Sequence, residues 1–407
     1  MPIIFAAGRV NRVICGMIDK LRKEFENVYF SNVSTTKGLE NLAINIGISK
    51  NSLRRFLGKI KNESLLRNST LNLISERLGY KSFRDFCENS NSDKPTMDFE
   101  LLDIYYGSVK GKGTSLNENR FQKANYYFAQ KILSNPIDLK EFVKRFFENE
   151  EALEYVVAWH PSYGHIAQEN YQDALLKLAK ISSKAHVKVF AYAFIYFGKF
   201  MSEQLKMDEA DHLMKMIEKS VIKMRKESGE FMVFPEARYS IAKHIHTFLH
   251  SINIGTAKTS GFKFRNIDEN RGESFADQIV FCTYVSNLLN ILKHYEMAEQ
   301  YFTEIPSEKQ LQICVEENQH LKPQLYLYKI TRATMLFKMD KREEALRIFD
   351  TLPIDINDSK SFSFDSKIYF ELQYYYLGKH LFPERKDFKE RFQILVERTQ
   401  FTYFNTI

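Results

Sequence analysis

Residues 36–57 read TKGLENLAINIGISKNSLRRFL and predict two short helices separated by a tight turn. The first helix gathers its apolar residues on one face, namely Leu39, Leu42 and Ala43. Thr35 or Thr36 can cap its start, because a hydroxyl accepts hydrogen bonds from the unpaired amides of a first helical turn. Gly47 supplies the turn, where a positive φ angle is often needed. Ser49 is then the expected cap of the second helix.

The helix that follows Ser49 has two unlike sides. With the helical period of about 3.6 residues, its apolar residues fall together, namely Leu53, Phe56 and Leu57. The opposite side holds cations, an amide and a hydroxyl, and no acid from this helix: Lys50, Asn51, Ser52, Arg54 and Arg55. Arg and Lys can donate to guanine, and Asn can pair with adenine. We therefore expect this helix to read DNA, the alternative being a solvated basic face.

The positive charge of the chain is concentrated at its N-terminal end. Lys59, Lys61 and Arg67 follow the basic helix and suit contacts to phosphate. Residues 1–90 hold 15 Lys and Arg and 8 Asp and Glu, a net charge of +7. The whole chain holds 58 and 51, also +7, so residues 91–407 carry no net charge. This distribution is typical of a small domain that meets nucleic acid and a larger one that does not.

Further helices are expected on both sides of the predicted pair. The segment from Val10 to Glu26 is amphipathic. Ser69 can cap a helix that ends at Gly79. Ser82 and Asp85 resemble a capping box for one more helix.

The polar segment 89–96 contains a proline and lacks apolar periodicity, which predicts a domain boundary. We expect a basic domain over residues 1–90, a linker over 91–98 and a second domain over 99–407. A further polar stretch, 255–272, is expected to be a long loop.

The composition favours an all-α fold. The chain has only 16 Gly and 9 Pro, so turn residues are scarce, while 34 Phe and 22 Tyr suit packing between helices. No run of about 18 apolar residues occurs, and the apolar start of the chain is too short for a signal sequence. The cysteines are isolated and are expected to be reduced packing residues of a cytoplasmic protein: Cys15, Cys87, Cys282 and Cys314.

The second domain contains degenerate helical repeats. Tetratricopeptide hairpins place two small residues 12 positions apart, where the paired helices approach most closely. Three pairs have this spacing: Gly198 with Ala210, Ser286 with Ala298, and Ala333 with Ala345. Ala210, Ala298 and Ala345 are 88 and 47 residues apart, whereas the consensus period is about 34. The expectation is a tetratricopeptide-like α-solenoid, and an unrelated helical solenoid is the alternative.

Stacked hairpins form a concave groove lined by the first helix of each pair. In this register four polar side chains are expected to line an effector groove: Lys199, Asn287, Asn290 and Lys338. An asparagine there could clamp a peptide backbone by donating and accepting at once. Ordinary exposed polar residues are the alternative.

Enzymatic motifs are missing from the sequence, which has no GxxxxGK[ST], GxSxG or HExxH pattern. His246 and His250 have the i,i+4 spacing of zinc sites. No carboxylate or cysteine lies near them in sequence to complete a ligand set, so we expect helix-surface histidines. The chain is predicted to be no enzyme and to hold no metal or cofactor.

The first domain resembles the lambda-repressor/Xre-type helix-turn-helix family over residues 36–88. The matching positions are Leu42-Ala43-x-x-Ile46-Gly47-Ile48-Ser49-x-x-x-Leu53 and Ser69-Thr70-Leu71-x-x-Ile74-x-x-x-Leu78-Gly79. The resemblance implies that the helix after Ser49 is the recognition helix. Residues 27–35 are an insertion relative to the family, and Lys59 stands where many members have a glycine.

Together with the repeats, this domain order resembles the Rgg/PlcR-type bacterial regulators. That resemblance implies a transcriptional regulator that is a homodimer, binds double-stranded DNA and responds to a peptide or protein effector, with no membrane partner. The alternative is a tetratricopeptide-like interaction scaffold whose basic head binds nucleic acid non-specifically or is vestigial.

Overall fold

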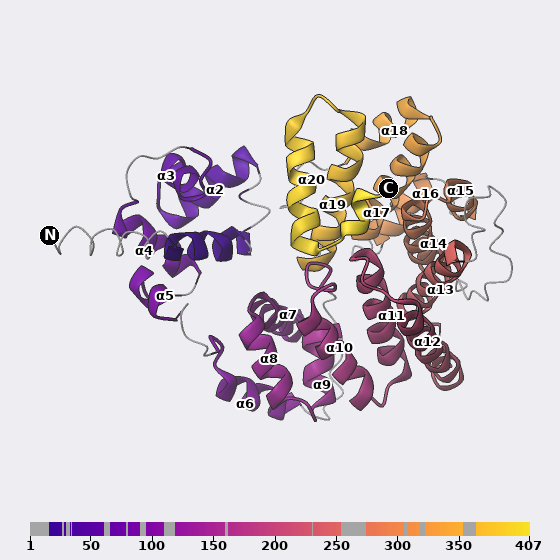
Figure 1. The fold of residues 1–407 in the computed structure, drawn as a ribbon, viewed down its shortest axis with the longest axis horizontal. Helices are drawn as coiled ribbons and strands as arrows, with labels where there is room; N and C mark the ends of the chain where they lie inside the picture. The colour runs from indigo at the N-terminus through magenta and orange to yellow at the C-terminus, as the bar shows by residue number, and fades with distance from the viewer. Residues whose placement is uncertain are drawn as a thin grey trace. The chain divides into compact units, whose positions relative to one another are not determined.

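The computed structural model of the chain describes residues 16–26, 28–29, 33, 35–60, 66–78, 80–89, 95–109, 119–158, 162–229, 231–253, 274–304, 308–317, 322–352 and 364–407. All regular elements among these residues are helices, which confirms the all-α prediction (Figure 1). No helix in this part of the chain combines the length and the apolar character that a membrane span requires. The chain divides between Asp98 and Phe99 into two compact units, here called unit 1 and unit 2.

Unit 1 contains a helix over residues 16–26 and four further helices: α2 (Thr36–Ile46), α3 (Lys50–Phe56), α4 (Asn68–Arg77) and α5 (Phe83–Asn89). Their apolar faces share one core. Phe25 of the first helix meets Phe56 of α3 edge to face, with ring centroids 5.5 Å apart. The Tyr80 hydroxyl donates to Glu24 at 2.9 Å, which ties the segment before α5 to the first helix.

Two of the helix starts in unit 1 differ in their capping. Ser82 accepts a hydrogen bond from the Asp85 amide at 3.1 Å, and Asp85 in turn accepts from the Lys81 amide at 2.8 Å, close to the predicted capping box. The prediction that Ser69 caps α4 is wrong. The helix already begins at Asn68, and its N-cap residue, Arg67, makes no side-chain cap bond.

Unit 2 begins with a group of short helices: α6 (Phe99–Val109), α7 (Asn119–Ser134), α8 (Pro136–Arg145), α9 (Glu150–Leu153), the π-helix η1 (Glu154–Ala158) and α10 (Glu169–Ile181). Further helices follow: α11 (Ala185–Met201), α12 (Met207–Glu227), α13 (Val233–Asn253), α14 (Phe275–Ile291), α15 (Tyr295–Glu304), α16 (Glu308–Glu317), α17 (Lys322–Lys338), α18 (Arg342–Phe349), α19 (Phe364–Leu381) and α20 (Lys386–Thr399), with a final 3-10 turn η5 (Thr402–Asn405).

From α11 onward, unit 2 is built of helical hairpins. α11 packs on α12, α14 on α15, α17 on α18, and α19 on α20. The first helices also pack in series: α11 against α13, α13 against α14, α14 against α17, and α17 against α19. One layer therefore runs through α11, α13, α14, α17 and α19, and the second helices pack along it (Figure 1).

The first and last helices of this layer meet across an aromatic centre. Tyr163, which precedes α10, stacks on Tyr369 of α19 with ring centroids 4.4 Å apart. Phe197 of α11 lies edge-on to Tyr369 at 6.2 Å. Arg238 of α13 is buried and donates to the Tyr163 hydroxyl. Aromatic rings from α11, α19 and the turn before α10 thus pack together here with one guanidinium from α13.

The predicted small-residue pairs lie in hairpins, but they do not all have the same role. The Ser286 hydroxyl donates to the Ala298 carbonyl at 3.3 Å, so α14 and α15 do approach there. Gly198 instead faces the turn before α10. A Cβ atom at this position would overlap the carbonyl oxygen of Ile166 and lie 2.8 Å from its Cγ1 atom. The lack of a side chain at 198 therefore serves the contact of α11 with that turn.

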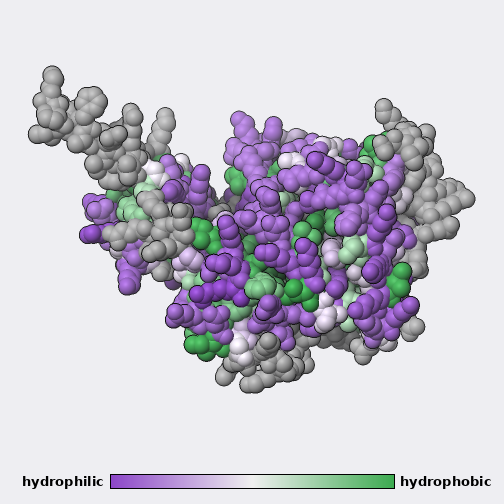
Figure 2. Space-filling model, turned by 60° about the horizontal axis from the view of Figure 1, so that its bottom comes forward, coloured by the Kyte–Doolittle hydropathy of each residue, from purple (hydrophilic) through white to green (hydrophobic). Residues whose placement is uncertain are grey.

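The face of the molecule in Figure 2 is mainly hydrophilic, and hydrophobic residues occur there in small groups. On α6, Leu101 and Ile104 lie one turn apart and are 54% and 71% exposed. This helix therefore presents a short apolar strip outside the core.

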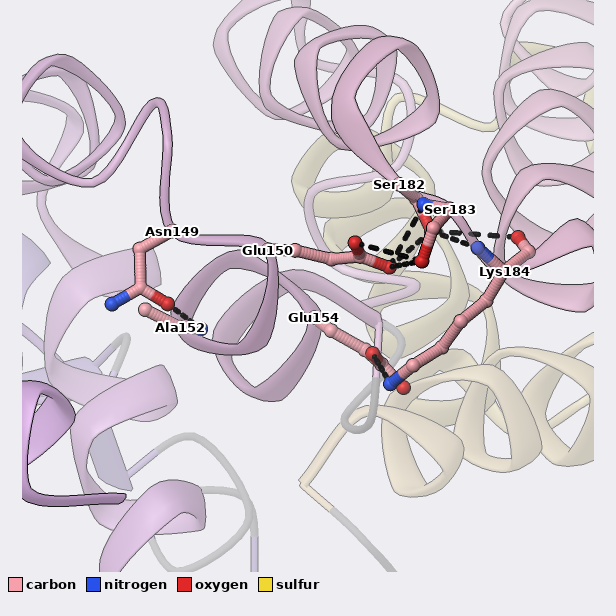
Figure 3. A network of polar contacts seen from close by, with 7 residues as sticks. All are labelled: Asn149, Glu150, Ala152, Glu154, Ser182, Ser183 and Lys184. Atoms are coloured by element: carbon pink, nitrogen blue, oxygen red, sulfur yellow. Dashed lines mark hydrogen bonds and ion pairs between the residues drawn. The ribbon is translucent and has the colours of Figure 1, made fainter. Parts of the chain in front are cut away.

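A polar network ties the start of α11 to α9 and η1 (Figure 3). Glu150 accepts from the Ser183 amide at 3.0 Å and from the Ser182 hydroxyl at 2.8 Å. Lys184, the N-cap residue of α11, pairs with Glu154 at 2.6 Å. Burial raises the pKa of Glu150, but the hydrogen bonds from both serines and the charge of Lys184 outweigh it, so this pKa is lowered.

Replacing Gly198 with alanine tests the close approach of α11 to the turn. Alanine normally stabilises a helix interior by up to about 1 kcal/mol relative to glycine. At position 198 we expect the opposite, a loss of about 1–3 kcal/mol, because the added methyl group overlaps backbone. The measurement is thermal unfolding of the full chain followed by circular dichroism.

Gly107→Ala is the matched control, because Gly107 is also helical and a Cβ atom there would meet nothing within 4 Å. This variant should melt at or above the temperature of the unmodified chain. A Gly198→Ala variant that melts as high as Gly107→Ala would contradict the described packing.

Candidate nucleic-acid interface

The turn between α2 and α3 has the geometry that the sequence predicts. Thr35 accepts a hydrogen bond from the Gly38 amide at 2.9 Å and caps α2. Gly47 ends that helix with a φ of 81°, and its amide donates to the Ala43 carbonyl at 3.0 Å. A residue with a side chain is strained in this left-handed conformation, whereas glycine is not. Ser49 then accepts from the Ser52 amide at 3.0 Å, which fixes where α3 begins.

The buried side of α3 is anchored in the core of unit 1. Leu53 and Phe56 have no exposed surface, and Leu57 is 6% exposed, as their spacing predicts. At the other end of the helix, Arg22 Nε donates to the Phe56 carbonyl at 2.5 Å. This contact satisfies one of the carbonyl groups that lack a partner at a helix end.

The outward side of α3 carries Asn51, Arg54 and Arg55. Asn51 and Arg55 are exposed and Arg54 is partly exposed. Because they are three and four positions apart, these side chains lie along one strip of the helix. No described residue forms a hydrogen bond or ion pair with any of the three side chains. The neighbouring Ser52 hydroxyl shares a hydrogen bond with the Ser49 hydroxyl at 2.9 Å.

The basic residues predicted to lie around this strip differ in whether their side chains already have a partner in unit 1. Lys50 forms an ion pair with Glu40 of α2, so an acid borders the basic side after all. Lys59 donates to the carbonyl of Val33 and thereby holds the segment before α2. Arg67 is exposed and has no side-chain cap bond. Lys61 lies outside the described residues.

The role of Glu40 is not visible in the sequence of either helix alone, because its partner is ten positions away. Only the angle between α2 and α3, which Gly47 sets, brings this carboxylate to Lys50. The proximity of an acid in the preceding helix is visible in the sequence, but the direction of its side chain is not. The predicted DNA contacts at Lys50 and Lys59 stay predictions, and both side chains have a partner within unit 1.

Two residues predicted to line an effector groove belong to the interior. Asn287 is 3% exposed and Asn290 is 6% exposed. The Asn287 amide group donates to the Thr331 hydroxyl at 3.0 Å, and its oxygen accepts from the Tyr369 hydroxyl at 2.7 Å. Asn290 donates to the Thr331 carbonyl at 2.8 Å. The prediction of an open groove at these positions is wrong, because the amides join α14 to α17 and α19.

The other two predicted groove residues are partly exposed. Lys199 forms an ion pair with Glu209 at 2.6 Å, which links α11 to α12. Lys338, at the end of α17, lies over the ring of Tyr376, with Nζ 5.4 Å from the centroid.

Lys338 belongs to a group of cations that we call the lysine cluster, with Lys293 and Lys379. Lys379 contacts the same Tyr376 ring at 5.0 Å and lies 3.5 Å from the centroid of Phe392. Burial, with the charge of Lys338 next, lowers the pKa of Lys379 to about 8. Burial and the charge of Lys293 also lower the pKa of Lys338. No acidic side chain among the described residues pairs with Lys338 or Lys379.

Comparison of the chain with models of protein families, with curated proteins and with solved structures found no match.

The lysine cluster predicts an unusual pH dependence. Because the folded-state pKa of Lys379 is about 8 and its ordinary value is 10.5, the unfolded chain binds the proton more tightly between these values. The positive charge of Lys379 therefore destabilises the folded state at neutral pH. This destabilisation declines as the pH rises above about 8, because the folded protein then loses the proton. We expect Lys379→Met to raise the melting temperature at pH 7, with a difference that shrinks towards pH 10.

The check is a series of thermal melts of both proteins between pH 6.5 and 10. Lys219→Met is the control, because Lys219 is exposed on α12 and is not among the charges that shift the pKa of Lys379. A Lys379→Met variant that melts at a lower temperature than the unmodified chain at pH 7 would contradict this prediction. It would mean that the charged side chain of Lys379 stabilises the folded state.

Proposed function

We propose that the chain is a sequence-specific DNA-binding regulator in which α3 enters the major groove. The observation that carries this proposal is the strip Asn51, Arg54 and Arg55. It faces outward from a helix whose other side is fixed in the core, and its side chains have no partner among the described residues. An unpaired amide and guanidinium on a rigid helix can meet base edges at little cost in reorganisation.

The residue types on the strip match the donor and acceptor pattern of the major groove. Asn51 can donate and accept at adenine N6 and N7, and Arg55 can donate twice to guanine O6 and N7. Arg67, exposed at the start of α4, suits a phosphate contact. Lys50 has a different role in this proposal, because its pairing with Glu40 orients α2 against the start of α3.

Unit 2 would supply the regulatory half of the protein: homodimerisation and effector binding, as in the Rgg/PlcR-type regulators that the sequence resembles. Within unit 2, the lysine cluster is the place where we expect the effector to bind. Two half-buried ammonium groups without an acidic partner favour an acidic effector, such as a peptide with carboxylate groups.

The test is selection of binding sites from random duplex DNA by the full chain, followed by affinity measurements on the enriched duplex and on a scrambled one. We expect Asn51→Ala to weaken binding to the enriched duplex by about 1–3 kcal/mol and to leave the scrambled duplex unaffected. Arg67→Ala should weaken both and reduce the slope of log affinity against log salt by about 1.

Lys81→Ala is the charge control. Lys81 is exposed just before α5, which lies apart from α3 in unit 1 (Figure 1). This variant should bind both duplexes as the unmodified chain does. The proposal fails if no sequence is enriched, or if Lys81→Ala weakens binding as much as Asn51→Ala.

An interaction scaffold is the second candidate function. The exposed apolar pair Leu101 and Ile104 on α6 favours it, because such strips often contact other proteins. In that case Leu101→Ser with Ile104→Ser would abolish capture of a stoichiometric protein partner, whereas Asn51→Ala would have no effect on it.

A further inference from the structure

Three potential metal ligands come together between α12 and α13. His246 and His250 lie one turn apart on α13, and Asp211 projects from α12. The Nε2 atom of His250 is 3.0 Å from Asp211 Oδ1, and the Nε2 atom of His246 is 3.6 Å from the same oxygen. One ligand atom from each residue lies within 4.8 Å of the other two. In the part of the chain that the structure describes, this is the one such group of three.

In the sequence, His246 and His250 lack a third ligand nearby, which favours surface histidines. The structure supplies that ligand from the preceding helix, 39 positions before His250. Packing of α12 against α13 brings it there. The i,i+4 spacing of the two histidines is visible in the sequence. The packing of α12 on α13, which adds the third ligand, is not.

The separations fit a small divalent cation. Zinc binds imidazole nitrogen and carboxylate oxygen at about 2.0–2.2 Å, so tetrahedral ligand atoms are roughly 3.3 Å apart. The separations of the two Nε2 atoms from Asp211 Oδ1, 3.0 and 3.6 Å, lie on either side of that value. The side chains of His246, His250 and Asp211 are 23%, 41% and 44% exposed, so an ion could enter from solvent.

A fourth residue holds one imidazole in place. The hydroxyl of Tyr196 on α11 lies 3.0 Å from His246 Nδ1. When that nitrogen donates to the tyrosine oxygen, the lone pair of His246 is at Nε2, on the side of Asp211. A hydrogen-bond partner on the second nitrogen is the usual support of a metal-binding histidine. Without an ion, the opposite tautomer suits the same atoms, with Nδ1 accepting from the tyrosine hydroxyl and Nε2–H directed at Asp211.

We propose that Asp211, His246 and His250 form a binding site for a divalent transition-metal ion, with Zn²⁺ the best match. Three protein ligands leave a fourth position for water or another ligand. The mixed nitrogen and oxygen ligands disfavour Ca²⁺ and Mg²⁺, which prefer oxygen alone. Because its ligands come from two helices, the bound ion would link α12 to α13. This proposal does not depend on DNA binding.

The test uses the full chain after treatment with a chelator and dialysis. Titration with Zn²⁺, followed by isothermal calorimetry, should show one ion per chain with a Kd on the order of micromolar or tighter. Zn²⁺ should also raise the melting temperature, because it binds the folded state, and Mg²⁺ should not. The absorption spectrum of bound Co²⁺ should indicate nitrogen and oxygen ligands in a low coordination number.

Variants locate the site. His250→Ala and Asp211→Asn should each weaken Zn²⁺ binding at least 10-fold, and Tyr196→Phe should weaken it about 10-fold through loss of support for His246. His212→Ala is the control, because His212 is exposed on α12 next to Asp211 but lies outside the group. Thermal melts of the metal-free variants establish that each is folded.

Two results would overturn the proposal. One is the absence of a stoichiometric Zn²⁺ site in the unmodified chain, which would leave the three side chains as a hydrogen-bonded contact between helices. The other is a set of variants that does not follow the site, with His212→Ala losing as much affinity as His250→Ala or Asp211→Asn losing none.

Discussion

Burial of Leu53 and Phe56 in the core of unit 1 determines which side of α3 faces outward. Successive residues of a helix are rotated by about 100°, so a start one position away would turn Asn51 and Arg55 towards the interior. Ser49 prevents this by capping the first turn. The proposed function depends on this fixed rotation more than on the number of basic residues.

Unit 2 joins the helices of its layer through buried polar groups as well as apolar contacts. Asn287 binds side chains from α17 and α19, and Arg238 lies among aromatic rings at the centre. A buried amide or guanidinium without partners would be costly, so these contacts favour one arrangement of the layer. The side chains of Lys338 and Lys379, and those of Asp211, His246 and His250, in contrast, are partly exposed.

Local signals were sufficient for much of unit 1. The turn at Gly47 and the cap at Ser49 depend on bonds across a few residues, and the apolar spacing of α3 follows from helical periodicity. Partners from other helices were not predictable in this way. Glu40, Asp211 and the neighbours of Asn287 are brought into place by packing angles and side-chain directions, which a single sequence does not encode in any local pattern.

Placing a photo-reactive amino acid at position 51 of the full chain tests the central claim most directly. If α3 lies in the major groove, irradiation with the enriched duplex should cross-link this position to DNA, and an excess of unlabelled duplex should suppress the product. The same group at position 81 should give no cross-link. Cross-linking at position 81 but not at 51, or at neither under conditions of binding, would contradict the account.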